Sequence, residues 1–249
     1  MRSNHHAATS ICLFMAALLF SHTAFAGTVF GSKHDLSTTG GITNKSTNET
    51  QVCIFCHTPH SARPSVPLWN RVISSSSMSY TLYSSPTLNA SPAFQDTGSP
   101  GSSELLGGPS RLCLSCHDGT ISVSNIINRF PDDQDPLMGS GTELDLDGSL
   151  RESRLSNLGG ATLGGSVADL SNDHPISFEY SSQLASADGE IYDPADPAHS
   201  EIQQLLKNYS GGRGNFECSS CHDPHNPDFK PFLVKNNNMS ALCLTCHIK

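Results

Sequence analysis

Eight cysteines and four histidines of this chain occur in one repeated pattern, Cys-x-x-Cys-His. The copies, numbered here as motifs 1 to 4, are Cys53-Ile-Phe-Cys56-His57, Cys113-Leu-Ser-Cys116-His117, Cys218-Ser-Ser-Cys221-His222 and Cys243-Leu-Thr-Cys246-His247. Two thiols three positions apart lie on one side of a helical turn, where they can form thioether bonds to the two vinyl groups of a haem. The histidine that follows is then placed to bind the iron. The pattern predicts four covalently attached c-type haems with His57, His117, His222 and His247 as proximal ligands.

Zinc sites and thioredoxin-like redox pairs also use Cys-x-x-Cys. Structural zinc combines two such pairs at one tetrahedral site, which leaves the histidine after every pair unexplained. A thioredoxin-like protein has its redox pair near a βαβ pattern, and four pairs without that pattern do not fit it. We therefore interpret each motif as an attachment site for haem c.

Five more histidines lie outside both the motifs and the first 26 residues: His34, His60, His174, His199 and His225. A haem iron with two protein ligands only passes electrons, whereas an open iron binds or activates small molecules. Five candidates for four distal positions predict that every iron is capped. Methionine is the alternative distal ligand, and the candidates are Met78, Met138 and Met239.

Two of these histidines repeat one arrangement: His60 ends Cys-His-Thr-Pro-His and His225 ends Cys-His-Asp-Pro-His. The proline pushes the residue before it out of the α region and so ends the turn. Three extended residues span only about 10 Å, too little to pass round a macrocycle to its opposite face. We expect both histidines to bind neighbouring irons; the alternative is that they are exposed loop residues.

The other three histidines differ in their surroundings. His34 and His174 each lie beside an aspartate, Asp35 and Asp173, which we expect to orient the imidazole through its Nδ1–H. His199 precedes Ser-Glu-Ile-Gln, a pattern typical of a capping box, which here predicts a short helix that ends at Asn208. We interpret His199 as a helix-entry residue and leave it out of the ligand set.

Composition predicts the fold class. The 249 residues include 20 Gly and 15 Pro but only 7% aromatic residues, which favours coil with short α-helices and little β structure. We expect a multihaem cytochrome c fold whose core is formed by stacked haems. The net charge of −9 argues against nucleic acid as a partner, because the chain cannot neutralise phosphates.

Residues 1–26 have the pattern of a cleaved signal peptide. Arg2 precedes an apolar run from Ile11 to Phe20, and Ala24-Phe25-Ala26 is typical of a cleavage site. The apolar run is too short to span a bilayer. We expect export, a mature tetrahaem domain over residues 27–249, no membrane anchor, and a location in the periplasm or outside the cell, including the cell surface.

The order of these features resembles the doubled-CXXCH multihaem cytochromes c, which are common in metal-reducing bacteria and include the OmcE-like surface cytochromes. The resemblance rests on the four motifs, on Lys33-His34-Asp35, on Asp173-His174-Pro175 and on the two repeats that end in His60 and His225. It implies bis-histidine haems with His34, His60, His174 and His225 as distal ligands. Relatives include periplasmic shuttles and cytochromes that polymerise into haem-stacked filaments, and His199 lies outside their pattern.

We expect an electron-transfer protein rather than an enzyme, with redox proteins or extracellular acceptors as its partners. The alternative is a multihaem oxidoreductase with one substrate-accessible haem that acts on nitrogen or sulfur oxyanions. Self-association into a filament is a further hypothesis, in which His34 binds a haem of the neighbouring subunit. In a monomeric shuttle, His34 instead folds back onto its own chain.

Overall fold

The computed structural model describes residues 28–41, 45–60, 68–71, 79–91, 109–119, 121–129, 134–139 and 167–248. All four motifs and the five additional histidines lie in these ranges. The predicted signal peptide, residues 1–26, and Met78 lie outside them. Within the described ranges, no helix has the length and apolar character needed to cross a bilayer.

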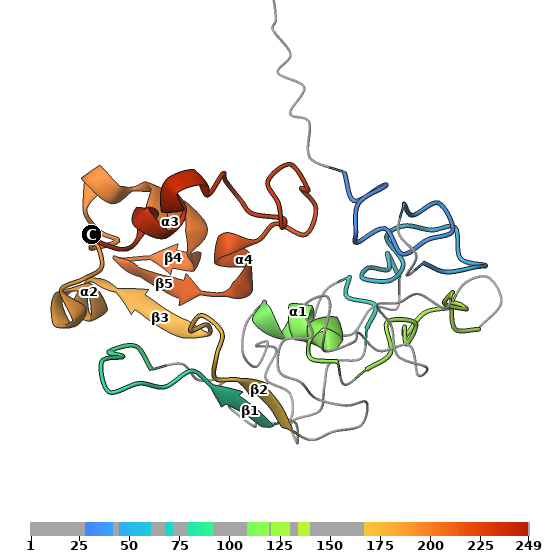
Figure 1. The fold of residues 1–249 in the computed structure, drawn as a ribbon, viewed down its shortest axis with the longest axis horizontal. Helices are drawn as coiled ribbons and strands as arrows, with labels where there is room; N and C mark the ends of the chain where they lie inside the picture. Colours follow the sequence, from blue (N-terminus) through green and yellow to red (C-terminus); the bar gives the residue numbers. More distant parts are fainter. Residues whose placement is uncertain are drawn as a thin grey trace, which may run out of the picture.

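The regular elements are short. The helices are α1 (Ser110–His117), α2 (Ser182–Asp188), α3 (Glu201–Leu205) and α4 (Cys218–Cys221), with 3-10 turns at Pro197–His199, Asn238–Ser240 and Cys243–Thr245. The strands are β1 (Ser79–Leu82), β2 (Val167–Leu170), β3 (Phe178–Ser181), β4 (Lys207–Ser210) and β5 (Arg213–Phe216). Figure 1 shows the C-terminal elements gathered on one side and the N-terminal loops on the other, with α1 between them.

A three-stranded antiparallel sheet, in the order β3-β5-β4, organises the C-terminal part. Strands β4 and β5 are joined by Gly211 and Gly212, which have φ values of 60° and 82°. Two consecutive residues at positive φ form the tight turn that suits the twist of a hairpin, and glycine adopts that conformation without a steric penalty. The composition favoured little β structure, and this hairpin was not predicted.

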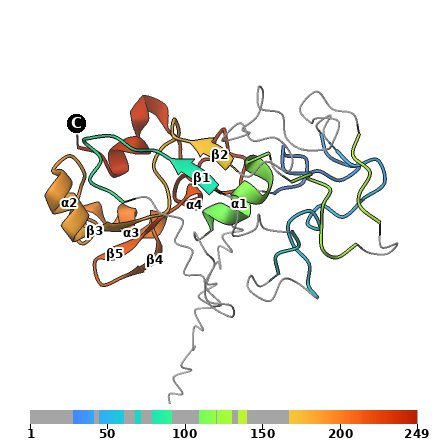
Figure 2. The ribbon, with the colours of Figure 1, turned by 90° about the horizontal axis from the view of Figure 1, so that it is seen from below.

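A second pairing joins segments that are far apart in the sequence. Strand β1 runs parallel to β2, with Ser79 opposite Val167 and Leu82 opposite Leu170. In Figure 2, these two strands lie next to α1. The Tyr80 hydroxyl donates a hydrogen bond of 2.7 Å to the buried Asp118 carboxylate just after α1, so that β1 is held against motif 2.

The helix predicted after His199 is shorter than expected and is not opened by a capping box. Helix α3 ends at Leu205, and Ser200 makes no side-chain capping bond. The side-chain cap lies earlier, where the Asp196 carboxylate accepts a bond of 2.9 Å from the Ala198 amide. Residues 207–210 form strand β4, so the predicted end at Asn208 was wrong.

Two small apolar clusters form the core of the described residues. The C-terminal cluster contains Tyr180, Ala185, Ile202, Leu206, Phe216 and Cys246. The other contains Ile54, Phe55 and Ile126, with Leu36, Cys56 and Met138 packed against it. Both clusters include residues of Cys-x-x-Cys-His motifs, so the attachment turns are part of the core.

Ile202 is fully buried in the C-terminal cluster, and we predict that Ile202→Ala lowers the free energy of unfolding of the haem-loaded protein by about 2–5 kcal/mol. Ile248→Ala is the matched control, because Ile248 is 45% exposed and should cost less than about 1 kcal/mol. Denaturant titrations followed by far-ultraviolet circular dichroism measure both values. Equal losses in the two variants would contradict the assignment of Ile202 to the core.

Candidate haem-binding sites

Each motif folds as one turn of helix. In motifs 1, 3 and 4, the amide of the histidine donates to the carbonyl of the first cysteine, over 2.7 Å, 3.0 Å and 2.9 Å. Motif 2 forms the second half of α1. This i to i+4 closure places the two cysteines of each motif on one side of the turn, as haem attachment requires.

The two residues between the cysteines anchor each turn in the protein. Ile54 and Phe55 of motif 1 are buried, as are Leu114 and Ser115 of motif 2, and Ser220 and Thr245 do the same for motifs 3 and 4. Residues i+1 and i+2 of a turn lie opposite positions i and i+3. Each turn therefore buries at least one of its middle residues, while the first cysteines of motifs 1 and 4, Cys53 and Cys243, are exposed.

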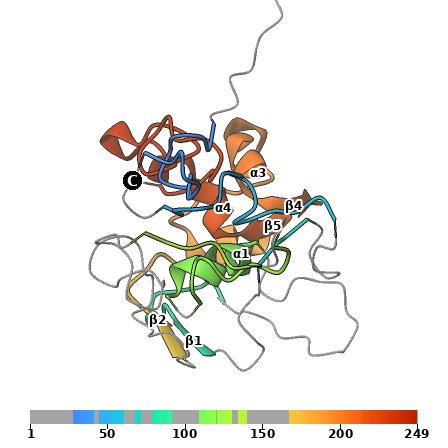
Figure 3. The same cartoon turned by 90° about the vertical axis from the view of Figure 1, so that its right-hand side faces the viewer.

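The motifs follow one another in space in the order that they have in the sequence. Residues 68–71 link motifs 1 and 2, because the Asn70 amide donates to the Cys56 carbonyl and Arg71 donates to the Ser115 carbonyl. Helix α1 packs against α4, as Figure 3 shows, and the Cys218 amide donates to the Ser110 hydroxyl, which links motifs 2 and 3. The segment 234–235 links motifs 3 and 4, because the Val234 amide donates to the Cys221 carbonyl and Lys235 donates to the Thr245 hydroxyl.

Three of the four motif histidines face a second histidine from a distant segment. Ring centroids are 6.1 Å apart for His34 and His117, 6.1 Å for His57 and His225, and 6.3 Å for His174 and His247. Two imidazoles on opposite sides of one metal ion, each with a bond of about 2.0–2.1 Å and a ring radius of about 1.1 Å, have centroids about 6.3 Å apart. The three pairs therefore have the spacing that two axial ligands of one iron need.

Backbone carbonyls of prolines orient three of the imidazoles. Nδ1 of His34 donates to Pro224 over 3.2 Å, Nδ1 of His174 to Pro175 over 2.8 Å, and Nδ1 of His222 to Pro231 over 3.0 Å. A carbonyl can only accept, so the proton is on Nδ1 and the lone pair is on Nε2. This second contact fixes the tautomer in which Nε2 is available to a metal.

The aspartates expected to orient His34 and His174 do not do so. The fully buried Asp35 carboxylate accepts from the amides of Gly31 and Ser37 and from the Ser37 hydroxyl, so it shapes the loop rather than the ring. His174 turns to the Pro175 carbonyl instead of Asp173. A backbone acceptor beside each ring makes the carboxylate unnecessary.

The loop that carries His34 is closed tightly enough to require a glycine. A Cβ atom on Gly40 would lie 2.1 Å from the backbone oxygen of Asp35. The His34 ring itself stacks on Phe232, with centroids 4.4 Å apart. His34 thus contacts its own chain at motif 2 and at the segment after motif 3.

Burial and neighbouring imidazoles change the pKa values of the paired histidines. Burial, and then the neighbouring His117, lower the pKa of His34, and burial followed by His225 lowers that of His57. Burial is also the largest cause of the lowered pKa of His174. Lowered values keep these rings neutral near pH 7, the form that can bind a metal.

Burial has the opposite consequence for the thiols. It raises the pKa of Cys56 and of Cys246 to about 12 and that of Cys221 to about 11. Only Cys218 has a lowered value among the shifted thiols, because Cys113 donates a hydrogen bond to it. Redox-active cysteines need a stabilised thiolate, which most of the shifted thiols do not have.

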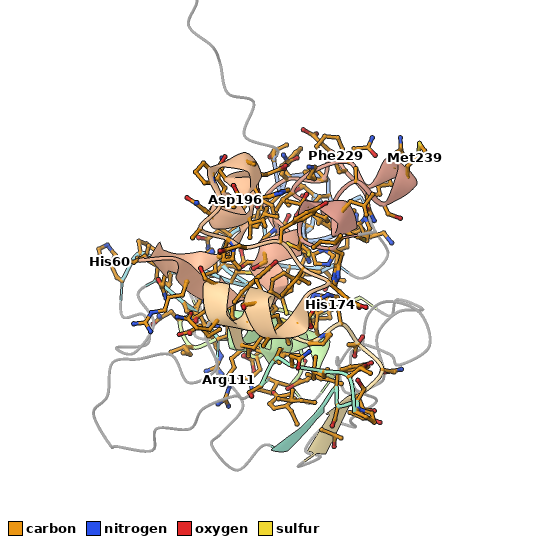
Figure 4. The ribbon with its side chains drawn as sticks, turned by 90° about the vertical axis from the view of Figure 1, so that its left-hand side faces the viewer. His60, Arg111, His174, Asp196, Phe229 and Met239 are labelled. Carbon is orange, nitrogen blue, oxygen red and sulfur yellow. The ribbon has the colours of Figure 1, made fainter. Side chains whose placement is uncertain are left out.

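The described part of the chain contains no cluster of side chains that could bind a zinc ion. Nowhere in those ranges do three or more His, Cys, Asp or Glu side chains gather as a metal site would require. The methionine candidates differ: Met138 packs against the Ile54 cluster, and Met239 is 94% exposed at the surface (Figure 4). Neither faces a motif histidine in the described contacts.

His60 and His199 are placed differently from the three paired histidines. His60 is exposed and projects at the edge of the molecule in Figure 4, and its ring meets no motif histidine among the described residues. His199 stacks on Tyr192, with centroids 3.7 Å apart, at the end of the Pro197–His199 turn. His222 is likewise exposed, and within the described ranges no second imidazole faces it at ligand spacing.

Two buried donors of the 68–71 segment also bear on the fit of a haem. Nε1 of Trp69 and Nε of Arg71 are buried and have no hydrogen-bond partner among the residues that the structure describes. Unpartnered buried donors are rare in native proteins and indicate a missing acceptor. Carboxylates of a prosthetic group near motif 1 would supply one.

Comparison with known proteins assigns a type to the C-terminal part. Residues 212–249, which contain motifs 3 and 4, match the family described as the doubled CXXCH motif. No curated protein matches the chain at a significant level. The match and the motif geometry support a c-type cytochrome of the multihaem type, which binds haem c covalently and transfers electrons.

We predict that His34→Ala, His174→Ala and His225→Ala each convert one low-spin haem to high spin, because each variant removes one member of a facing pair. His199→Ala is the matched control and should leave the spectrum unchanged, because this ring packs on Tyr192. Electron paramagnetic resonance of the oxidised proteins counts the high-spin irons. A high-spin signal from His199→Ala, or none from the other three, would contradict the pairing.

Proposed function

We propose that this protein carries electrons through four covalently bound c-type haems, one at each motif. The single observation that carries this proposal is the set of three facing histidine pairs at 6.1–6.3 Å, each of which joins a motif histidine to a histidine outside the motifs. Two-histidine ligation leaves no coordination site for a substrate. His34, His225 and His174 are then the distal ligands opposite His117, His57 and His247.

The spatial order of the motifs supports a route for the electrons. Each consecutive pair of motifs has thiols in contact or in electrostatic range. Haem supplies the one-electron chemistry, while the chain sets its spacing, axial ligands and electrostatic environment. We infer a single path that runs from motif 1 to motif 4 or in reverse.

We place this carrier in the periplasm or outside the cell. The signal-peptide pattern of residues 1–26 supports export. Redox proteins or extracellular acceptors are the partners that this location implies. The net negative charge favours partners with a positively charged docking surface.

We further propose self-association through the iron at His222. Three distal histidines are used within the chain, which leaves the exposed His60 unused and the His222 iron without a second imidazole from the described residues. His60 of a second copy would complete that iron. Repeating a contact of this head-to-tail kind produces a filament. His34 is unsuited to that bridging role, since it already faces His117 of its own chain.

The oxidoreductase alternative uses the same iron. If His222 carries a haem that stays open, a small oxyanion can reach it, and the protein is then a reductase. The observation that favours this second candidate is that no second imidazole from the described residues faces His222 at ligand spacing. The two hypotheses differ in what fills the sixth position.

Haem content is the first test. We predict that the purified protein has the mass of the chain from about residue 27 plus four haems, with no thiol left to alkylate, because every described cysteine belongs to a motif. Intact-mass spectrometry after iodoacetamide treatment measures both quantities. Three haems, or bound zinc in place of one, would overturn the proposal.

The second test addresses His60. We predict that the wild-type protein has one high-spin haem when diluted to monomer and none when assembled, because His60 reaches His222 only from another copy. The His60→Ala protein should keep one high-spin haem at every concentration and should not assemble. Light scattering and electron paramagnetic resonance on the same samples report both properties, with His199→Ala as the control.

Carbon monoxide separates the two candidates. In the proposed carrier, carbon monoxide binds the reduced His60→Ala protein at one haem and does not bind the assembled wild type. Binding to the assembled wild type favours the reductase. Four low-spin haems in a strictly monomeric wild type would refute the role of His60.

A further inference from the structure

Residues 68–71 connect motif 1 to motif 2. The Thr58 amide donates to the Leu68 carbonyl, and the Asn70 amide donates to the Cys56 carbonyl, both over 2.9 Å, so the segment pairs with the end of motif 1. From its other end, Arg71 reaches the Ser115 carbonyl between the two cysteines of motif 2. The segment therefore lies between two attachment turns.

Arg71 carries a positive charge into this junction. Its side chain is completely buried, and its terminal nitrogens donate to the carbonyls of Val123 over 2.7 Å, Ser115 over 3.0 Å and Ser122 over 2.9 Å. No carboxylate among the described residues pairs with it. A buried charge without a counter-charge is expensive, and Nε–H in addition has no acceptor.

Trp69 provides a second donor of the same kind. Its indole packs edge-to-face on the His57 ring, with centroids 5.4 Å apart and an interplanar angle of 82°. The indole Nε1–H is buried and finds no acceptor in the described part of the chain. Residues 69 and 71 are alternate positions of an extended segment, so their side chains leave it on the same side, opposite to Asn70.

The side chain of Asn70 leaves the segment on the opposite side from Trp69 and Arg71, and there every donor and acceptor has a partner. Its amide group donates to the carbonyls of Ile54 and Asn128, and its oxygen accepts from the Asn128 amide. The Asn70 side chain thus has hydrogen-bond partners for both its amide nitrogen and its oxygen. What the segment lacks is an anionic acceptor for two N–H groups beside a buried cation.

We propose that Trp69 and Arg71 bind a propionate carboxylate of the haem attached at Cys53 and Cys56. A carboxylate accepts several hydrogen bonds and supplies the counter-charge that Arg71 lacks. We assign the carboxylate to the haem of motif 1, because the Trp69 indole packs on the histidine of that motif and the neighbouring Asn70 amide donates to the Cys56 carbonyl. This inference rests on the proposed haem at motif 1.

The pair has a consequence for the reduction potential. Reduction of an iron adds one negative charge, and a cation fixed in a low-dielectric interior stabilises that charge more than a solvated one does. Arg71 therefore holds the potential of the motif 1 haem above the value that it would have with a neutral side chain. In a chain of net charge −9, this buried cation makes the reduction potential of one haem differ from those of the others.

The experiment compares three variants of the haem-loaded protein by spectroelectrochemistry. We expect Arg71→Gln to move one of the reduction midpoints to lower potential while the others stay in place. Trp69→Phe keeps an aromatic ring beside His57 and removes the N–H together with part of the ring volume but no charge, so it should move the same midpoint in the same direction by a smaller amount. Arg213→Gln removes an equal charge from a side chain that is 67% exposed and should move none of them appreciably.

Several outcomes would overturn the inference. Unmoved midpoints in both Arg71→Gln and Trp69→Phe would do so, as would an equal shift of all midpoints, which would indicate bulk charge. If Arg71→Gln does not fold, Trp69→Phe still decides the question. A protein that lacks a haem at motif 1 shows this in its mass, so failure of the proposed function is distinguishable from failure of this inference.

Discussion

The bond from the histidine amide to the first cysteine carbonyl is the constraint on which the other parts of the structure depend. It closes each motif into one helical turn and thereby directs two sulfur atoms and one imidazole to the same side. Because the turn is so short, helix propensity contributes little to its stability, and contacts with the surrounding residues must hold it in place. The buried middle residues, such as Phe55 and Leu114, provide that support.

The histidine pairs then connect parts of the chain that no local interaction joins. His34 contacts the carbonyl of Pro224, which is 190 positions away, while its ring faces motif 2. The ring of His225, three residues after motif 3, lies beside the ring of His57 in motif 1. Closing loops of this length costs conformational entropy that a few van der Waals contacts do not repay. In the proposed haem-loaded protein, coordination of both imidazoles to one iron would be strong enough to do so.

The sequence predicted the helical turns and the separate position of His199, because both follow from spacing within a few residues. It also led to the expectation that His225 serves a neighbouring motif, which its position beside His57 fits. The prediction that Asp35 and Asp173 orient the imidazole rings was wrong. The acceptors are the backbone carbonyls of prolines, and a residue's type does not indicate which backbone carbonyl will accept a hydrogen bond. The sheet was missed because its strands are short and polar, although Gly211-Gly212 marks the hairpin.

The apolar clusters are small, whereas several polar side chains beside the motifs are buried, among them Arg71, Asp118 and Glu217. The Glu217 carboxylate accepts bonds from the hydroxyls of Ser110 and Ser177, so it ties motif 3 to the start of α1. Burying such groups opposes folding unless each finds its partner. The partners lie at the junctions between consecutive motifs, where α1 meets α4 and where residues 68–71 meet motif 2. The polar contacts therefore determine which motif lies beside which, and in the proposed haem-loaded protein the apolar surface of the haems would supply the driving force that the clusters lack. A chain of this composition can then specify an electron path without a large core of its own.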